Sequence, residues 1–268
     1  MKKLTTLKIK SHKLQREKHS LQMLTCYDFQ TAQMLEQTGI DMLLVGDSLG
    51  NVMLGYETTV PVSLDEMKIF SAAVKRGAPN KFIVADLPFG SYSTLEQGIE
   101  SATKLFQYSN VESIKLEGAF PYQLELIERL TQIGIPVMGH IGLTPQSVHE
   151  LGGYYVHGKD DASAKKLLEQ AINLEKAGAF AVVLECVKSE IATAITEKLS
   201  IPTIGIGAGN KTDGQVLVIN DLLKEGPHTP PKFCTPIANL FDLKKDLITN
   251  YLNKNQEVAK ANVQPSVH

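Results

Sequence analysis

The sequence has few cysteines and no long apolar run, and its charges nearly balance. Cys26, Cys186 and Cys234 are odd in number and widely spaced, with no CxxC pair, so neither a disulfide framework nor a zinc site is indicated. No run of about 18 apolar residues occurs, which excludes a membrane-spanning helix. The formal net charge of -2 gives no electrostatic reason to expect a nucleic acid or an anionic membrane as a partner. A reducing cytoplasm is consistent with these absences.

Arginine is scarce in the first twenty residues, which are rich in lysine. Because no apolar stretch of signal-peptide length precedes Leu21, we expect a basic, solvated arm over about residues 1–20. A transit peptide is the weaker alternative, since such peptides are rich in arginine. At the other end, the polar residues from about 253 to 268 predict a flexible tail.

Short runs of valine, isoleucine and leucine alternate with helix-patterned segments along most of the chain, which is typical of a parallel sheet. With 268 residues and 43% hydrophobic composition, the chain can bury a large core. Eight such runs predict a closed (β/α)8 TIM barrel as a single domain over residues 1–268, and an open doubly wound sheet is the main rival. The predicted strands are at about 21–26, 41–47, 81–86, 111–117, 135–140, 179–185, 201–206 and 215–219.

Local signals for helix ends agree with this alternation. Capping boxes begin at Ser63 and Ser93, each with a glutamate three residues later, and Thr144 precedes a proline at a helix start. A further helix is expected over about 236–252, after a loop that begins at Gly226. The glycines expected to end helices in a left-handed conformation are Gly39, Gly134 and Gly178.

Four of the predicted strands run from apolar residues directly into an acid. These acids are Asp47, Asp86, Glu117 and Glu185. Because the carboxyl ends of parallel strands meet at one rim of a barrel, we expect the four side chains to converge there. Packing alone does not explain such a pattern, so it indicates a functional site.

Lys115 lies two residues before Glu117, so both side chains point to the same face of their strand. A lysine inside a barrel needs an acid or an anionic ligand nearby. Asp47, Asp86 and Glu117 together leave a surplus of negative charge, which is costly unless a cation is bound. Oxygen ligands without a cysteine or histidine cluster favour Mg²⁺, which can chelate an α-keto acid and stabilise its enolate.

Three further polar residues have both a functional and a structural interpretation. Glu185 follows an apolar run and is suited to abstract a proton, or it is a buried acid satisfied by backbone amides. His140 bonds the substrate, holds a neighbouring acid, or is structural. Ser48 donates to a bound carboxylate, or it caps a turn.

Two familiar motifs are incomplete in this chain. Gly46 to Gly50 matches the G-x-S-x-G nucleophile elbow and the GDSL string of a lipase family, but no histidine follows an aspartate by three residues, as that chemistry requires. The segment from Gly205 to Asn210 lacks the third glycine of a dinucleotide-binding loop. Its glycines either cradle a phosphate or carboxylate, or form a tight turn.

The chain resembles the ketopantoate hydroxymethyltransferase (3-methyl-2-oxobutanoate hydroxymethyltransferase) family in eight segments that occur in the family's order. They are LTCYD (24–28), LLVGDSLGNVMLGYETTVPV (43–62), VADLPFGSY (84–92), IKLEG (114–118), GIPVMGHIGLTPQS (134–147), LECV (184–187), IPTIGIGAG (201–209) and DGQVLV (213–218). The combination is far more specific than any single motif.

The resemblance implies an enzyme that transfers a hydroxymethyl group from 5,10-methylenetetrahydrofolate to 3-methyl-2-oxobutanoate, giving 2-dehydropantoate for pantothenate and coenzyme A synthesis. It implies a barrel of the phosphoenolpyruvate/pyruvate type in a cytoplasmic homo-oligomer, often a decamer. It also implies Mg²⁺ as cofactor and Glu185 as the proton acceptor. By position, the metal ligands are Asp47, Asp86 and Glu117, and the substrate-binding residues are Asp47, Ser48, Asp86, Lys115 and His140.

Two other functions remain open on the sequence. A related metal-dependent lyase or mutase for an oxaloacetate-like acid would use the same barrel and metal, and Cys186 is its only candidate catalytic cysteine near a strand end. A catalytically silent barrel would bind a keto acid or organise an assembly. Retention of all four acids together with Lys115 favours a working site.

Overall fold

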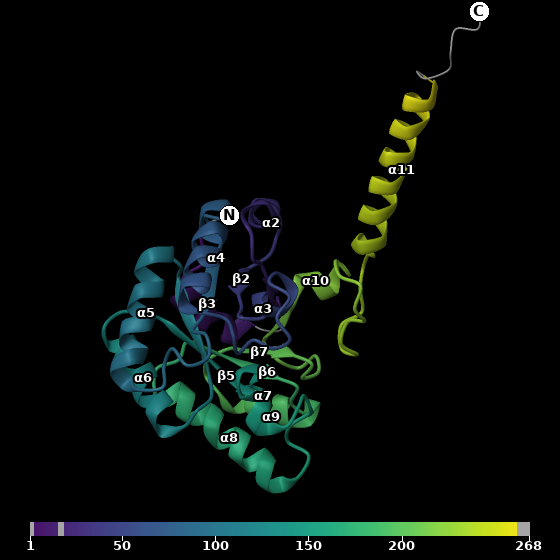
Figure 1. The fold of residues 1–268 in the computed structure, drawn as a ribbon. Coiled ribbons are helices and arrows are strands. Elements are labelled where there is room, and N and C mark those ends of the chain that lie inside the picture. The colour runs from purple at the N-terminus through teal and green to yellow at the C-terminus, as the bar shows by residue number, and fades with distance from the viewer. Residues whose placement is uncertain (1–2, 16–18, 262–268) are drawn as a thin grey trace, which may run out of the picture. The chain divides into compact units, whose positions relative to one another are not determined.

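The computed structural model describes residues 3–15 and 19–261 of the chain. In this part of the chain, eight parallel strands pair in sequence order and close into a barrel, with β8 returning to β1 (Figure 1). The predicted (β/α)8 barrel is therefore confirmed, and every strand lies within two residues of its predicted bounds. The strands are β1 (Leu21–Thr25), β2 (Met42–Val45), β3 (Phe82–Asp86), β4 (Ser113–Glu117), β5 (Val137–Gly142), β6 (Ala181–Glu185), β7 (Thr203–Ile206) and β8 (Gly214–Leu217).

Helices connect the consecutive strands from β1 to β7 and cover the outside of the barrel, whereas a loop joins β7 to β8 (Figure 1). The long ones are amphipathic, as expected where one helix face packs on a sheet and the other meets water. The helices are α2 (Phe29–Glu36), α3 (Leu49–Val52), α4 (Leu64–Gly77), α5 (Leu95–Ser109), α6 (Pro121–Gln132), η2 (Pro145–Ser147), α7 (Val148–Leu151), α8 (Asp161–Lys176) and α9 (Ser189–Lys198). Among the described residues, no helix is long and apolar enough to cross a membrane.

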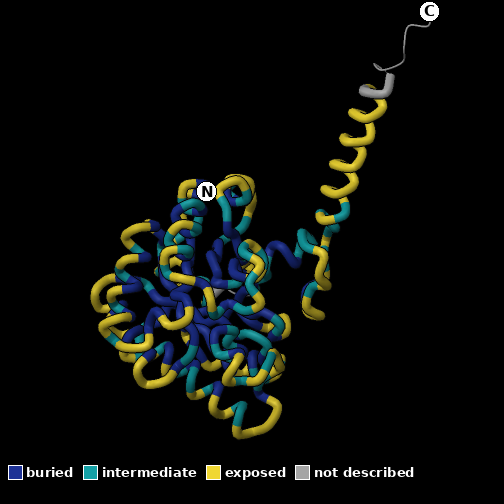
Figure 2. Tube along the Cα trace, viewed as in Figure 1, coloured by how far each residue is buried: buried dark blue, intermediate teal, exposed yellow. Residues whose placement is uncertain are grey.

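The chain divides into two compact units, Met1–Val218, which contains the barrel, and Ile219–His268. That both belong to one domain stays a prediction. The second unit contains α10 (Ile219–Leu222) and α11 (Leu240–Ala261), and residues 243–258 of α11 are exposed (Figure 2). Helix α11 begins later than expected and continues past residue 252, so most of the predicted tail is helical. Residues 262–268 lie outside the described part.

Alternate residues of the strands fill the barrel interior. On β3, Phe82 and Val84 belong to the buried core, and the next inward position is Asp86. On β6, Ala181 and Val183 precede Glu185 in the same way. The alternation that places every second residue in the apolar core therefore also points the last residue of β3 and of β6 into the mouth of the barrel.

The amino-terminal end of the barrel is covered by helix α1 (Thr6–His12), which is followed by η1 (Lys13–Gln15). Ile9 of α1 is fully buried in the barrel core, and Lys13 forms a salt bridge with Asp213 at 2.7 Å. The expectation of a solvated arm is therefore wrong for α1 and for Lys13, because the apolar residues at the strand starts need a cover. Residues 16–18 of the expected arm lie outside the described part.

The predicted helix signals are confirmed in part. Ser63 and Glu66 form the expected capping box of α4. The cap of α5 is Thr94 and not Ser93, because the Ser93 hydroxyl bonds the Gly90 carbonyl while Thr94 accepts from the Gln97 amide. Thr144 precedes η2 without a side-chain cap bond. Gly134 and Gly178 have φ of 94° and 103°, whereas Gly39 is not left-handed, since the Thr38 hydroxyl already bonds a terminal carbonyl of α2.

Candidate functional site

Asp47 and Asp86 meet at the mouth of the barrel, and both are buried. The backbone amide of Asp47 donates to Asp86 Oδ2 at 3.1 Å, so the turn after β2 lies against the end of β3. A β-carbon on Gly46 would lie 2.9 Å from the Ser48 hydroxyl and would displace it, whereas its distance of 3.5 Å from Asp86 Oδ2 would be an ordinary contact. The convergence predicted for these two acids is confirmed.

Lys115 is paired with Asp86 by the register of the sheet. The two residues are directly opposite each other on β4 and β3, and their charged atoms lie 3.0 Å apart. Lys115 Nζ also lies 3.3 Å from His140 Nδ1. Burial alone would lower the pKa of Lys115, but Asp86, Glu117 and Asp47 together raise it above its usual value. The lysine is therefore charged at neutral pH.

His140 lies between two of the acids. Its Nδ1 is 3.5 Å from Glu117 Oε1, and its Nε2 is 3.2 Å from Glu185 Oε2. Burial and Lys115 lower the pKa of His140, but its bonds to Glu117 and Glu185 outweigh them and raise that pKa to about 9. A protonated His140 carries a proton on each ring nitrogen and attracts both acids, although its Nε2 makes no well-aligned hydrogen bond among the described residues. Of its three sequence interpretations, the structure places His140 as the partner of neighbouring acids.

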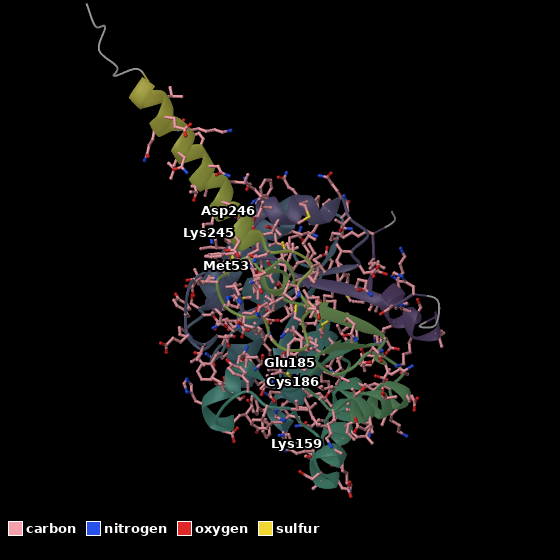
Figure 3. All side chains as sticks on the ribbon, turned by 90° about the vertical axis from the view of Figure 1, so that its right-hand side faces the viewer. Met53, Lys159, Glu185, Cys186, Lys245 and Asp246 are labelled. Atoms are coloured by element: carbon pink, nitrogen blue, oxygen red, sulfur yellow. The ribbon has the colours of Figure 1, made fainter. Side chains whose placement is uncertain are left out.

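Glu185 ends β6 with 17% of its side chain exposed, so it is the most accessible of the acids described above. The next residue, Cys186, has a left-handed backbone with φ of 48°, which is uncommon for a residue other than glycine. Gly142 packs against this turn, because a β-carbon on Gly142 would lie 2.2 Å from the Glu185 carbonyl oxygen. In Figure 3, Glu185 and Cys186 lie between Met53 and Lys159.

Three residues of this cluster carry no obvious sequence signal. Gln146, in the turn after β5, donates from its side chain to Asp47 Oδ2 and from its backbone amide to Glu117 Oε2. Tyr92 donates its hydroxyl to the Gln146 side chain. The hydroxyl groups of Tyr27 and Ser48 share a hydrogen bond of 2.8 Å. The Ser48 hydroxyl does not bond the backbone at the start of α3. All three residues occur in segments that carry the family resemblance, and only that signal points to them.

The cluster has more negative than positive charge. Four acids face two basic side chains, Lys115 and His140, so two negative charges are unbalanced if all groups are ionised. Burial, Glu117 and Asp86 raise the pKa of Asp47 well above its usual value, and burial is also the main cause of a raised pKa at Asp86. A proton or a cation is therefore needed here, and a divalent cation fits the charge.

Asp47 and Asp86 are the pair that could hold such a cation. Glu117 also contacts Gln146 and His140, and Asp86 also contacts Lys115 and the Asp47 amide. Across residues 3–15 and 19–261, no three histidine, cysteine or carboxylate side chains are arranged as a ready ligand set. Two carboxylates nevertheless suit Mg²⁺, which keeps several positions for water and substrate.

A cavity of about 410 Å³ opens beside this cluster. Glu117 and Gln146 form part of its wall, so the cavity and the acid cluster share side chains. The rings of Phe120 and Tyr122 lie nearly parallel at its edge, with an interplanar angle of 5°. Further aromatic residues of the lining are Phe89, Tyr92 and Tyr155.

The structure does not support serine or cysteine nucleophiles. Ser48 is bonded to Tyr27, and no histidine bonds its hydroxyl in the described part of the chain. Burial and the charge of Glu185 raise the pKa of the Cys186 thiol to about 11, so this residue is not a thiolate at neutral pH. The nucleophile elbow and the catalytic cysteine are both disfavoured.

Comparison with solved structures supports the barrel fold. Phosphoenolpyruvate phosphomutase from Streptomyces platensis subsp. rosaceus has a TM-score of 0.59 and 11% identity, covering 96% of this chain and 88% of its own. Oxaloacetate acetylhydrolase in complex with the product oxalate has a TM-score of 0.60 and 13% identity, covering 97% and 100%. At such low identity these similarities establish the barrel fold alone.

Sequence comparison is more specific. The family model for ketopantoate hydroxymethyltransferase matches residues 3–261. A 3-methyl-2-oxobutanoate hydroxymethyltransferase from Leptospira interrogans serogroup Icterohaemorrhagiae serovar copenhageni is 48% identical over 235 residues, which cover 87% of this chain and 89% of that protein. The enzyme of the same name from Thermosipho africanus is 50% identical over 237 residues, covering 88% and 89%. The chain therefore belongs to the ketopantoate hydroxymethyltransferase family.

Proposed function

We propose that this protein transfers a hydroxymethyl group from 5,10-methylenetetrahydrofolate to 3-methyl-2-oxobutanoate. With water, the reaction gives 2-dehydropantoate and tetrahydrofolate. Membership of the family supports this reaction. The observation that carries the mechanism is the convergence of the Asp86–Lys115 pair with the Glu117–His140–Glu185 chain of contacts at one barrel mouth.

Mg²⁺ is the proposed metal, held by Asp47 and Asp86. When bound, it would supply a Lewis acid beside the α-keto acid and stabilise negative charge that develops on the substrate. The surplus negative charge of the cluster supports this choice. Both oxygens of Glu117 have partners in Gln146 and His140, and both oxygens of Asp86 have partners in the Asp47 amide and Lys115. Among the described residues, Asp47 Oδ1 is therefore the least engaged oxygen of the three predicted ligands.

The keto acid is bound by charge and by a hydroxyl group. Lys115 is held in place by Asp86 and remains charged, so it attracts the substrate's negative charge. Ser48 presents its hydroxyl from the turn that carries Asp47, with Tyr27 fixing its position. Neither residue needs to move far, since both are anchored by buried partners.

Glu185 is the proposed acceptor of the proton on C3 of 3-methyl-2-oxobutanoate. Its partial exposure leaves it accessible to substrate, and His140 fixes its orientation from below at 3.2 Å. Removal of the proton gives an enolate, whose charge Lys115 helps to balance. Water replaces both C–N bonds of the one-carbon unit, leaving its oxygen on that carbon and its two hydrogens on the nitrogens of tetrahydrofolate. The carbanion carbon forms the C–C bond to the same carbon, and the proton taken by Glu185 returns to the oxygen to complete the hydroxymethyl group.

The one-carbon donor carries two planar groups, the pyrimidine part of its pterin and its p-aminobenzoyl ring, and the cavity beside Glu117 suits such a ligand. Phe120, Tyr122 and Tyr155 offer aromatic faces for stacking, and the shared wall with Glu117 brings the cavity next to the acid cluster. We therefore place the folate there. A cytoplasmic location and a homo-oligomeric, decameric assembly stay predictions from the family resemblance.

The test is proton NMR of 3-methyl-2-oxobutanoate in D₂O with protein and Mg²⁺, with and without tetrahydrofolate and formaldehyde. We expect Mg²⁺-dependent exchange of the C3 proton without folate, and 2-dehydropantoate when folate is added. Oxaloacetate is supplied in a parallel sample to test the lyase alternative. Folded protein that neither exchanges the proton nor forms 2-dehydropantoate would contradict the proposal, as would cleavage of oxaloacetate alone.

A further inference from the structure

We propose that Gln146 is a positioning residue that orients the carboxylate of Asp47 for cation binding. Gln146 lies in η2, the turn after β5, and is 99 residues from Asp47 in the sequence. Its side chain is buried, with 5% of the residue exposed. The inference rests on the proposed function, in which Asp47 is one of the two ligands of Mg²⁺.

The side-chain amide of Gln146 has every hydrogen-bonding group engaged. Its Nε2 donates to Asp47 Oδ2 at 2.7 Å and to the Leu87 carbonyl at 2.9 Å, and its Oε1 accepts from the Tyr92 hydroxyl. A backbone carbonyl can only accept, so the NH₂ group must face Leu87 and Asp47. Tyr92 then has to donate. The orientation of the amide is therefore determined by its neighbours.

The backbone of Gln146 holds a second acid of the cluster. Its amide N–H donates to Glu117 Oε2 at 3.1 Å. The turn itself is closed by a bond from the Ser147 amide to the Thr144 carbonyl at 2.8 Å. One rigid turn thus contacts Asp47 on the loop after β2 and Glu117 at the end of β4.

The consequence for Asp47 is a carboxylate with one oxygen held. Oδ2 accepts from Gln146, and no hydrogen bond to Oδ1 occurs within the described residues. With Oδ2 fixed, rotation of the carboxylate is restricted and Oδ1 keeps one direction. Hydrogen bonds of this kind orient metal ligands, and their loss typically weakens metal binding by about 10–100-fold.

The experiment measures cation binding directly, without turnover. Mg²⁺ is titrated by calorimetry, and Mn²⁺ by electron paramagnetic resonance, in the absence of keto acid and folate. The variants are Gln146→Met, which keeps the side-chain length but removes the amide, and Tyr92→Phe, which removes only the hydroxyl that orients it. Gln97→Ala is the matched control, because the Gln97 amide bonds the Gly90 carbonyl away from the acids.

We expect Gln146→Met to raise the dissociation constant for both ions by about 10-fold or more, and Tyr92→Phe to raise it less. In the double variant, the loss of binding free energy should be smaller than the sum of the two single losses, because both substitutions act through one amide. Excess Mg²⁺ should restore much of the turnover of Gln146→Met, whereas a general loss of packing would not respond to Mg²⁺. Gln97→Ala should bind as the wild type does.

Unchanged Mg²⁺ and Mn²⁺ binding in a folded Gln146→Met protein would overturn the role of Gln146. If Gln146→Met does not fold, the role of Gln146 is tested by Tyr92→Phe, which leaves Gln146 in place. Unchanged cation binding in Tyr92→Phe would contradict the proposal that the Gln146 amide orients Asp47. Failure of the wild type to bind either ion would overturn the metal assignment of the proposed function itself. The two failures are therefore distinguishable.

Discussion

The two ends of the barrel treat charge in different ways. At the amino-terminal end, two acids pair with lysines: Asp213 pairs with Lys13, and Glu112 pairs with Lys75 and Lys3. At the carboxyl-terminal end, four acids share Lys115 and His140. One end is balanced and closed by an apolar cover, whereas the other is unbalanced and carries a cavity. The same eight strands therefore support a stabilising end and a reactive end, and substitutions at the two ends should separate stability from activity.

The largest effect is expected at the reactive end, from Glu185→Gln. The amide cannot accept the C3 proton, so exchange into D₂O and turnover should both fall by about 10²–10⁴-fold. Proton NMR and a 2-dehydropantoate assay measure the two rates. Glu190→Gln, on the exposed first turn of α9, is the matched control and should leave both rates unchanged. Exchange at the wild-type rate in Glu185→Gln would remove this residue from the mechanism.

At the stabilising end, Ile9→Ala should lower the free energy of unfolding by about 2–5 kcal/mol, because it leaves a void in the core. Urea denaturation followed by circular dichroism measures this change. Below the unfolding transition, C3 exchange should remain at the wild-type rate. Leu7→Ala removes a largely exposed side chain of the same helix and should cost little. A large loss of C3 exchange in folded Ile9→Ala would contradict the view that this end of the barrel contributes to stability and not to activity.

Asp86→Asn should weaken Mg²⁺ and keto acid binding together, by about tenfold or more, since the variant loses a ligand charge and the partner of Lys115. Calorimetric titrations of each ligand measure this. Glu112→Gln breaks a similar acid–lysine pair at the opposite end of the barrel. It should reduce stability without changing either titration. Identical titrations for Asp86→Asn and the wild type would contradict the ligand assignment.

Phe120→Ala tests whether folate binding in the cavity can be separated from C3 exchange at the acid cluster. Loss of one stacking ring should raise the KM for the folate by about tenfold or less, while folate-independent C3 exchange continues. Steady-state kinetics and the exchange assay separate these outcomes. Tyr108→Ala removes an exposed ring on α5 and serves as the control. Equal losses in exchange and transfer would place Phe120 outside a folate subsite.

The smallest effect is expected from the cap of α4. Ser63→Ala should cost about 1 kcal/mol at neutral pH. The backbone amide and hydroxyl of Ser63 lower the pKa of Glu66, so that the carboxylate contributes stability above its ordinary pKa of 4.5 and loses it as the pH falls through the lowered value. The difference between wild type and variant should therefore shrink as the pH falls below 4.5 and through the lowered pKa of Glu66. A difference that grows in acid would contradict this sign.

The sequence predicted the strands and the acids for one physical reason. A buried parallel strand reads as an apolar run, and its inward period of two continues into Asp86, Glu117 and Glu185. Both signals are local, so one chain suffices to detect them. The pairing of Lys115 with an acid followed from the cost of burying a charge, although the sequence did not specify which acid.

The missed features depend on tertiary contacts or on competition between neighbours. Gln146 bonds Asp47 across 99 residues, and no periodicity connects the two. The burial of Ile9 depends on which surface the first helix meets. Ser93 and Thr94 are equally good caps by residue type, and the Gly90 carbonyl decides between them. These features depend on the three-dimensional arrangement of the chain, which cannot be derived from residue types alone.

The sheet register has a consequence for how this protein tolerates change in length. Asp86 faces Lys115, and Glu117 faces His140, only because neighbouring strands are aligned residue for residue. A single residue inserted within β4 would turn Lys115 and Glu117 toward the helix layer and bring apolar residues into the mouth. Loops can lengthen without changing this alignment, so insertions are tolerated between the strands and not within them. The positions of the catalytic side chains therefore depend on the register of the sheet.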